Sequence, residues 1–248
     1  MLNFVKRGKG KKTVVLLHGW GGAWQSWAPI IERLQNKFTV YALDLPGFGL
    51  SPLSKPYSLI DYVGDIEEFL IKHKIKKPIL VGHSFGGQIA AKVAIEKGKM
   101  LSGVVLVDAA VSRRNDISMK LNILLAQAGR LVLEKPGLYP MLRRLFYRLR
   151  GMENSDYYNL SYNSHLQKTA SKIFREDLIA DLSKIKVPTL LIWGERDPLE
   201  MTSVEIGKLA NEHIKGSKLV VIPNAGHFSY LEEQEKFCLA LTDFIKDL

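Results

Sequence analysis

The sequence predicts an α/β fold, in which a mostly parallel β-sheet carries helices on both faces and an all-helical insertion. Short apolar runs, often β-branched, alternate along the chain with longer stretches of helical periodicity. Between about Val111 and Leu182 this alternation stops, and only helical spacing remains. A chain of 248 residues is long enough for one large domain with such an insertion.

The expected strands are short, apolar on both faces and bounded by Gly, Pro, Asp or Asn, as buried parallel strands are. They cover Thr13–Leu17, Phe38–Leu43, Ile79–Val81, Val104–Val107, Thr189–Trp193 and Leu219–Ile222. Helical spacing lies between them, for example over Leu59–His73 and Gln88–Lys97. Because parallel strands are joined by right-handed crossovers, these helices should cover both faces of the sheet.

The insertion contains only helical patterns. Its apolar residues repeat at helical intervals in four pieces, namely 117–131, 138–149, Ser164–Phe174 and Glu176–Leu182. We therefore expect a core formed by residues 1–110 and 183–248, and a helical cap, or lid, formed by residues 111–182.

The composition is that of an ordinary soluble globular protein, with 46% apolar and 24% charged residues. The sequence contains neither a run of about 18 apolar residues nor the apolar stretch of a signal peptide, so we expect a cytoplasmic protein without a membrane span. The net charge of +10 is spread over the chain without a nucleic-acid-binding motif. We interpret it as a solvated basic surface and expect no nucleic-acid partner.

A candidate nucleophile follows the predicted strand Ile79–Val81. Gly82-His83-Ser84-Phe85-Gly86 lies between this strand and a predicted helix, which is the context of a Gly-x-Ser-x-Gly nucleophile elbow. The turn is so tight that the residues beside the serine must nearly lack side chains, hence Gly82 and Gly86. An incidental glycine-rich turn is the alternative interpretation.

A serine hydroxyl is a poor nucleophile at neutral pH and needs a base within hydrogen-bond reach. Of the six histidines, His227 is the one that follows the last predicted strand, directly after a glycine and downstream of a candidate acid. His18 and His83 flank the glycine turns, where we expect them to hold loops together. His227 is therefore the predicted general base.

The acid that orients this histidine should also lie at the carboxyl end of a strand. Asp197 follows the strand Thr189–Trp193 and precedes His227 by one helix–strand unit. Its task would be to fix the imidazole tautomer and to stabilise the imidazolium. Asp108, which follows Val104–Val107, is the competing candidate.

An oxyanion hole is expected near the first strand. His18-Gly19-Trp20-Gly21-Gly22 follows Thr13–Leu17, and glycines there let backbone N–H groups approach a developing oxyanion. We expect the donors to be the backbone amides of Trp20 and Phe85, the latter at a helix N-terminus. Each such donor typically stabilises a transition state by about 3–4 kcal/mol.

The chain resembles the α/β-hydrolase superfamily over nearly its whole length. The resemblance rests on five segments in family order: HGWGG at 18–22, DLPGFGLS at 44–51, GHSFGG at 82–87, WGERDP at 193–198 and NAGHF at 224–228. It implies an eight-stranded, mostly parallel sheet with a cap after the sixth strand. Only Leu2–Lys6 precedes Thr13, so the first strand should be absent or shortened, and we expect seven to eight strands. The serine at position 84 separates the chain from epoxide hydrolases and haloalkane dehalogenases, which have Asp there.

Within the superfamily, HGWGGAWQSW at 18–27 and the short N-terminus resemble the carboxylesterases that demethylate pimeloyl-carrier-protein methyl ester. In that group, basic cap residues engage an acidic acyl carrier. Here Arg143, Arg144, Arg148 and Arg150 cluster opposite the apolar stripe of one predicted cap helix. A docking face for an acidic carrier protein is one interpretation, and an ordinary solvated helix face is the commoner one.

Together these residues predict a serine esterase that cleaves carboxylic esters with an apolar acyl part through an acyl-enzyme intermediate. The same triad would serve a carbon–carbon bond hydrolase or a thioesterase, and a slow-turnover ligand receptor could retain the same pocket. The sequence has no CxxC, no HExxH and no GxGxxG after a strand, so we expect neither a metal nor a cofactor.

Overall fold

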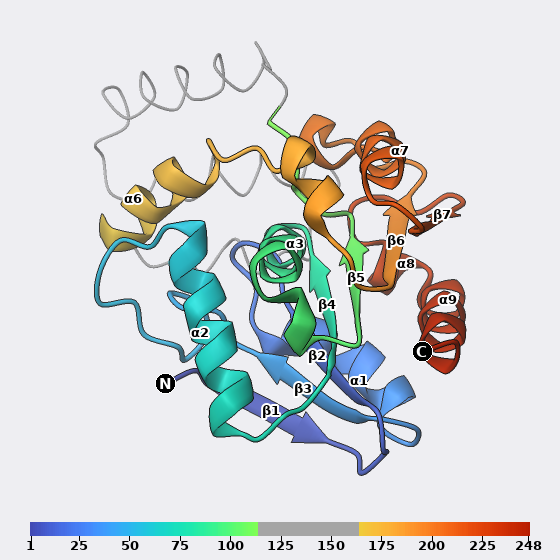
Figure 1. Cartoon of the computed structure of the whole chain (residues 1–248), viewed down its shortest axis with the longest axis horizontal. Helices are drawn as coiled ribbons and strands as arrows, with labels where there is room; N and C mark the ends of the chain where they lie inside the picture. The colour runs from blue at the N-terminus through green and yellow to red at the C-terminus, as the bar shows by residue number, and fades with distance from the viewer. Residues whose placement is uncertain (114–163) are drawn as a thin grey trace, which may run out of the picture.

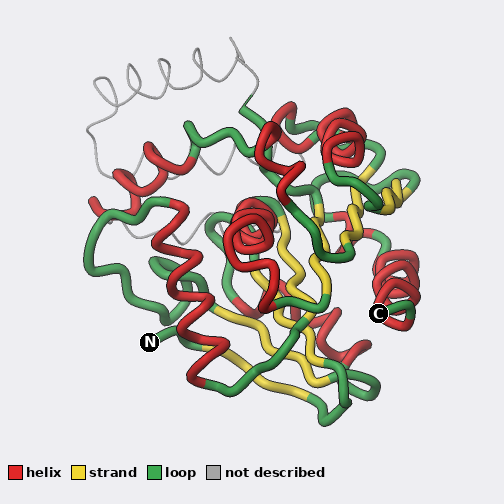
Figure 2. Tube along the Cα trace, in the orientation of Figure 1, coloured by secondary structure: helices red, strands yellow, loops and turns green. Residues whose placement is uncertain are grey.

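A computed structural model describes residues 1–113 and 164–248, and its architecture confirms the predicted α/β fold (Figures 1 and 2). The described residues form one seven-stranded sheet in the order β1-β3-β2-β4-β5-β6-β7. The strands are β1 Phe4–Arg7, β2 Thr13–Leu17, β3 Thr39–Leu43, β4 Ile79–His83, β5 Gly103–Val107, β6 Thr189–Gly194 and β7 Lys218–Ile222. The pair β1–β3 is antiparallel and every other pair is parallel.

The N-terminal strand is short and lies at the edge of the sheet. β1 pairs with β3 in a register that sets Phe4 opposite Leu43 and Arg7 opposite Val40. Its last two residues are exposed, which fits an edge position. Over the residues that the structure describes, the sheet has seven strands, the smaller of the two numbers expected from the sequence.

Helices cover both faces of this sheet, as the alternation predicts. They are α1 Ala28–Leu34, α2 Leu59–Lys72, α3 Phe85–Lys97, α6 Ser164–Ile173, α7 Val204–His213, α8 Ser229–Glu232 and α9 Gln234–Lys246, with short 3-10 turns η1 Trp24–Trp27, η2 Gly98–Met100, η4 Ile179–Lys184 and η5 Glu200–Thr202. One apolar core contains residues of α2, α3 and α7, and the other contains residues of α1 and α9. Figure 1 shows α3 crossing in front of the central strands. Among the described helices, none combines the length and the apolar character needed to cross a membrane.

Successive strand residues point to opposite faces, so each strand serves both cores. In β2, Val15 and Leu17 belong to one core, whereas Val14 and Leu16 belong to the other, and all four are fully buried. This double burial explains why the strands carry no polar alternation in the sequence.

Of the predicted cap, the structure describes only the two ends. The predicted helix Ser164–Phe174 is present as α6, and η4 covers part of the predicted piece Glu176–Leu182. The predicted helices 117–131 and 138–149, and the arginine cluster on the second of them, lie outside the described residues. The limits of the cap at residues 111 and 182 stay predictions.

Both described ends of the predicted cap are bonded to α3 through one buried side chain, that of Gln88. The Gln88 Oε1 atom accepts a hydrogen bond from Arg113 Nη2 at 3.0 Å. Its Nε2 atom donates to the carbonyl oxygens of Ile173 and Glu176, at 3.3 and 3.2 Å. One amide thus joins the outgoing and the returning chain to the helix that follows the candidate nucleophile.

Candidate active site

Ser84 lies at the junction between β4 and α3, in the strand–turn–helix context predicted for it. Its φ of +52° and ψ of −112° fall outside the regions that L-residues normally occupy, and the residue is 7% exposed. Its N–H donates to the carbonyl of Val107 at 2.9 Å, and its own carbonyl accepts from the N–H groups of Gln88 and Ala110 at 3.0 and 3.1 Å. These bonds hold a strained backbone in place, as functional turns require.

The glycines beside this serine are required by close backbone packing. A Cβ atom on Gly82 would overlap the carbonyl oxygen of Gly86. A Cβ atom on Gly86 would overlap the carbonyl oxygens of Leu17, the last residue of the neighbouring strand β2, and of His18. Side chains at either position would force α3 away from the sheet.

His227 and Asp197 form a buried pair. The Nδ1 atom of His227 donates to Asp197 Oδ2 at 2.7 Å, and the side chains are 3% and 0% exposed. Asp197 follows β6 and His227 follows β7, and these strands are parallel neighbours, so their carboxyl ends meet. Asp197 Oδ1 accepts from the Leu199 N–H at 2.9 Å. Because Nδ1 carries the proton shared with Asp197, Nε2 is the nitrogen available to accept another.

The electrostatics favour a protonatable imidazole. Burial lowers the pKa of His227, but the negative charge of Asp197 and its hydrogen bond outweigh burial and raise this pKa above its ordinary value.

A further side chain, that of Thr202, contacts the imidazole. Its Oγ1 atom lies 3.2 Å from the Nδ1 atom of His227, and Thr202 is fully buried in η5. Sequence reasoning missed Thr202, because no motif marks it.

Asp108, the competing acid, has other partners. It follows β5 with a φ of +42° and is fully buried. Its Oδ1 accepts from the Gly194 N–H at 2.7 Å, and its Oδ2 accepts from the Ser229 hydroxyl at 2.6 Å. The carboxylate bonded to the His227 ring is that of Asp197.

The two histidines beside the glycine turns join loops, as predicted. His83 Nε2 donates to the carbonyl of His227 at 2.7 Å, and the two rings lie 4.8 Å apart between centroids. Burial, with the nearby charge of His227, lowers the pKa of His83 well below its ordinary value, so this ring is neutral. His83 therefore links the turn of Ser84 directly to the loop of His227. In the other histidine, His18, the Nε2 atom accepts from the Leu45 N–H at 3.0 Å.

The glycine-rich loop after β2 lies against the nucleophile. A Cβ atom on Gly19 would come within 3.5 Å of the Ser84 Cβ. The Trp20 ring packs on the rings of Phe48, Phe85 and Phe174, with centroid distances of 5.0, 5.2 and 4.9 Å. We call these four rings the aromatic cluster. It places the residues of the two expected oxyanion donors, 20 and 85, side by side.

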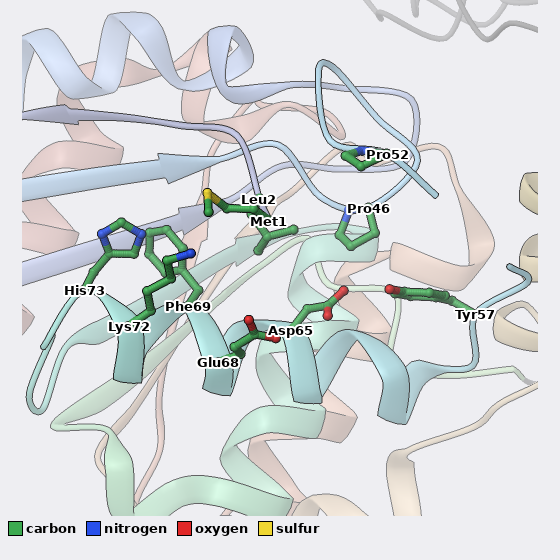
Figure 3. A pocket seen from close by; sticks show the side chains of 10 residues that line it. All are labelled: Met1, Leu2, Pro46, Pro52, Tyr57, Asp65, Glu68, Phe69, Lys72 and His73. Carbon is green, nitrogen blue, oxygen red and sulfur yellow. The ribbon is translucent and has the colours of Figure 1, made fainter. Parts of the chain in front are cut away.

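A separate open pocket lies beside α2 and the N-terminus (Figure 3). Asp65 and Glu68 project from α2 toward it, and Tyr57 lies at its far end (Figure 3). Burial and the neighbouring Asp65 raise the pKa of Tyr57 to about 12. None of the three candidate catalytic residues lines this pocket.

Comparisons with known proteins identify the family to which this fold belongs. The family model of the alpha/beta hydrolase fold matches residues 12–234. An uncharacterized hydrolase of Bacillus subtilis is 30% identical over 96% of this chain and 91% of its own length. The pimeloyl-[acyl-carrier protein] methyl ester esterase of Wigglesworthia glossinidia brevipalpis is also 30% identical, over 96% of this chain and 95% of its own length.

Among solved structures, an esterase from Exiguobacterium antarcticum superposes with a TM-score of 0.83 at 24% identity, over 99% of this chain and 95% of that one. At this identity the likeness supports the fold alone. The family match spans most of the sequence, including positions 84, 197 and 227. The chain therefore belongs to the alpha/beta hydrolase family.

Proposed function

We propose that this hydrolase cleaves carboxylic esters through an acyl-enzyme formed on Ser84, with His227 as general base and Asp197 as the acid that orients it. The observation that carries this proposal is the buried 2.7 Å hydrogen bond from His227 Nδ1 to Asp197 Oδ2. His83, the residue before Ser84, donates to the His227 carbonyl at 2.7 Å, so the loop of this pair is bonded to the strained turn of Ser84, which matches a nucleophile elbow. Curated relatives that are named esterases favour ester cleavage over carbon–carbon or thioester cleavage.

In the first half-reaction, His227 Nε2 takes the proton of the Ser84 hydroxyl while Oγ attacks the ester carbonyl carbon. Asp197 stabilises the resulting imidazolium and keeps the proton on Nδ1. The imidazolium then gives its proton to the alkoxide leaving group, and the ester C–O bond breaks. In the second half-reaction, His227 takes a proton from a water molecule, whose oxygen attacks the acyl carbonyl carbon. The imidazolium then gives this proton to Ser84 Oγ as the Oγ–acyl bond breaks, which releases the carboxylic acid and restores the free serine.

The oxyanion formed in both halves would be bound by the backbone amides of Trp20 and Phe85. Support for this assignment comes from the packing of the Trp20 ring on the Phe85 ring and from the approach of Gly19 to Ser84. The Phe85 amide also lies in the first turn of α3, where the helix dipole favours negative charge.

The substrate we propose is a small ester with an apolar acyl part. The aromatic cluster beside Ser84 supports this choice, because aromatic faces favour apolar ligand groups. A carrier-linked acyl group docked on the cap arginines is a narrower proposal, motivated by the carrier-protein ester named for one relative. A cytoplasmic location stays a prediction from the sequence.

A panel of nitrophenyl esters of increasing acyl length tests the proposal. We expect a burst of nitrophenol equal to the enzyme concentration, and loss of both burst and turnover in Ser84→Ala. Ser183→Ala, at an exposed serine away from the site, is the matched control and should behave like the wild type. Turnover by Ser84→Ala at the wild-type rate would refute the proposal.

A further inference from the structure

We propose that Asp108 is a positioning residue that joins the three loops carrying the candidate triad. This inference rests on the proposed function and adds a fourth side chain to it. The mechanism leaves Asp108 unused, although it is a fully buried carboxyl group close to the reacting groups. Its place at the end of β5, which lies between β4 and β6, puts it between the nucleophile and the acid–base pair.

The first connection is to the nucleophile. The Val107 carbonyl accepts the N–H of Ser84 at 2.9 Å, and the Ala110 N–H donates to the Ser84 carbonyl at 3.1 Å. The backbone on both sides of Asp108 therefore holds the strained serine. Asp108 itself has a φ of +42°, so the segment turns sharply at this point.

The second and third connections use the two carboxyl oxygens. Oδ1 accepts from the Gly194 N–H at 2.7 Å, and Gly194 ends β6 three residues before Asp197. Oδ2 accepts from the Ser229 hydroxyl at 2.6 Å, and Ser229 lies two residues after His227. One carboxyl group thus fixes the acid loop and the base loop relative to each other. Such fixing matters because a shift of about 1 Å in reacting groups can cost about 100-fold in rate.

The groups around Asp108 favour a carboxyl group that carries little charge at neutral pH. Burial and the negative charge of Asp197 raise the pKa of Asp108 to about 8, while His227, Ser229 and the Gly194 amide act in the opposite direction. In its protonated form the carboxyl group carries the proton on Oδ2 and donates it to the Ser229 oxygen instead of accepting, and a carboxamide has the same shape and the same arrangement of donor and acceptor. It can accept from the Gly194 N–H and donate to the Ser229 oxygen, so Asp108→Asn preserves both connections, whereas Asp108→Ala removes them.

The test compares Asp108→Asn with Asp108→Ala by two measurements. The first is kcat and KM for the best nitrophenyl ester, per active site counted from the burst. The second is the NMR signal of the His227 Nδ1 proton, which does not depend on turnover. We expect Asp108→Ala to lower kcat about 100-fold at a KM within about threefold and to weaken the Nδ1 signal. Asp108→Asn should keep the signal and stay within about fivefold of the wild-type kcat.

A second pair of variants covers the case in which Asp108→Ala does not fold. Ser229→Ala removes one connection only, and we expect kcat to fall about tenfold. Thr189→Val removes a buried hydroxyl at the opposite end of β6, where Oγ1 donates to the Val187 carbonyl, and should leave kcat unchanged.

Three results would overturn the inference: a wild-type kcat and Nδ1 signal in Asp108→Ala, equal impairment of Asp108→Asn and Asp108→Ala, or a wild-type kcat in Ser229→Ala. If the wild-type protein cleaves no ester, the proposed function fails. The Nδ1 signal then still decides whether Asp108 positions His227.

Discussion

Asp197 and His227 are 30 residues apart in the sequence, yet their side chains form a 2.7 Å hydrogen bond at the ends of two adjacent parallel strands. Both side chains are almost completely shielded from solvent. Removing one partner would therefore leave the other buried without its counterpart, which is costly in proteins. The pair should matter for stability as well as for catalysis.

Replacing the acid tests the orientation of the base. Asp197→Asn keeps the shape of the side chain but no longer fixes the proton on Nδ1, so we expect kcat to fall about 10⁴-fold. Asp181→Asn is the control, since Asp181 pairs with Lys184 at the surface and should leave the rate unchanged. A loss smaller than about tenfold in Asp197→Asn would contradict the assignment.

The rate should depend on the protonation of His227. The base acts in its neutral form, so kcat/KM rises with pH as the imidazole loses its proton. Because Asp197 raises the pKa of His227 above 6.5, the midpoint of this rise should lie above pH 6.5. Measuring kcat/KM between about pH 5 and about pH 9 locates it. A midpoint well below the ordinary histidine pKa would disagree with the buried pair.

The strained backbone of Ser84 should be visible in the free energy of unfolding. At a φ of +52°, glycine is accommodated with less strain than alanine. We expect Ser84→Gly to be more stable than Ser84→Ala by about 1 kcal/mol, although both are inactive. Urea unfolding of the two variants measures this difference. A more stable alanine variant would argue against strain at this position.

The raised pKa of Asp108 predicts a pH-dependent stability. Its carboxyl group titrates at about pH 8 in the folded protein and at about 3.8 in the unfolded chain, so the folded state binds more protons between these values. Its contribution to stability is therefore present at low pH and is lost as the pH rises from about 4 to about 8. Asp108→Asn removes this loss.

The free energy of unfolding of Asp108→Asn, relative to the wild type, should accordingly increase over this interval. Urea unfolding at about pH 5, 7 and 8.5 measures it. A difference that stays constant with pH would show that the carboxyl group does not titrate as described.

Much of the fold could be predicted because doubly buried strands leave a plain signal in the sequence. The strand β1 was harder to predict, since only the first two of its residues, Phe4 and Val5, are apolar. An edge strand of this kind owes its conformation to pairing with β3, which the local sequence does not encode.

The candidate site could be predicted in part, because each of its residues follows a parallel strand. Asp108 and Asp197 have this property in common, so the sequence alone left both as candidates. The path of the loops after β6 and β7 decides which carboxylate faces His227. The same loops bring Thr202 and Ser229 into the site, and no spacing rule marks either residue.

The hydrogen bonds of Gln88 bear on how substrate preference can be changed by engineering. Because Arg113 and Ile173 are held by the same amide, the two described ends of the predicted cap meet at one side chain of α3. A segment of another length can be inserted between these ends while Gln88 and its partners are kept. Grafting such segments is therefore a route to new acyl selectivities that leaves the reacting residues unchanged.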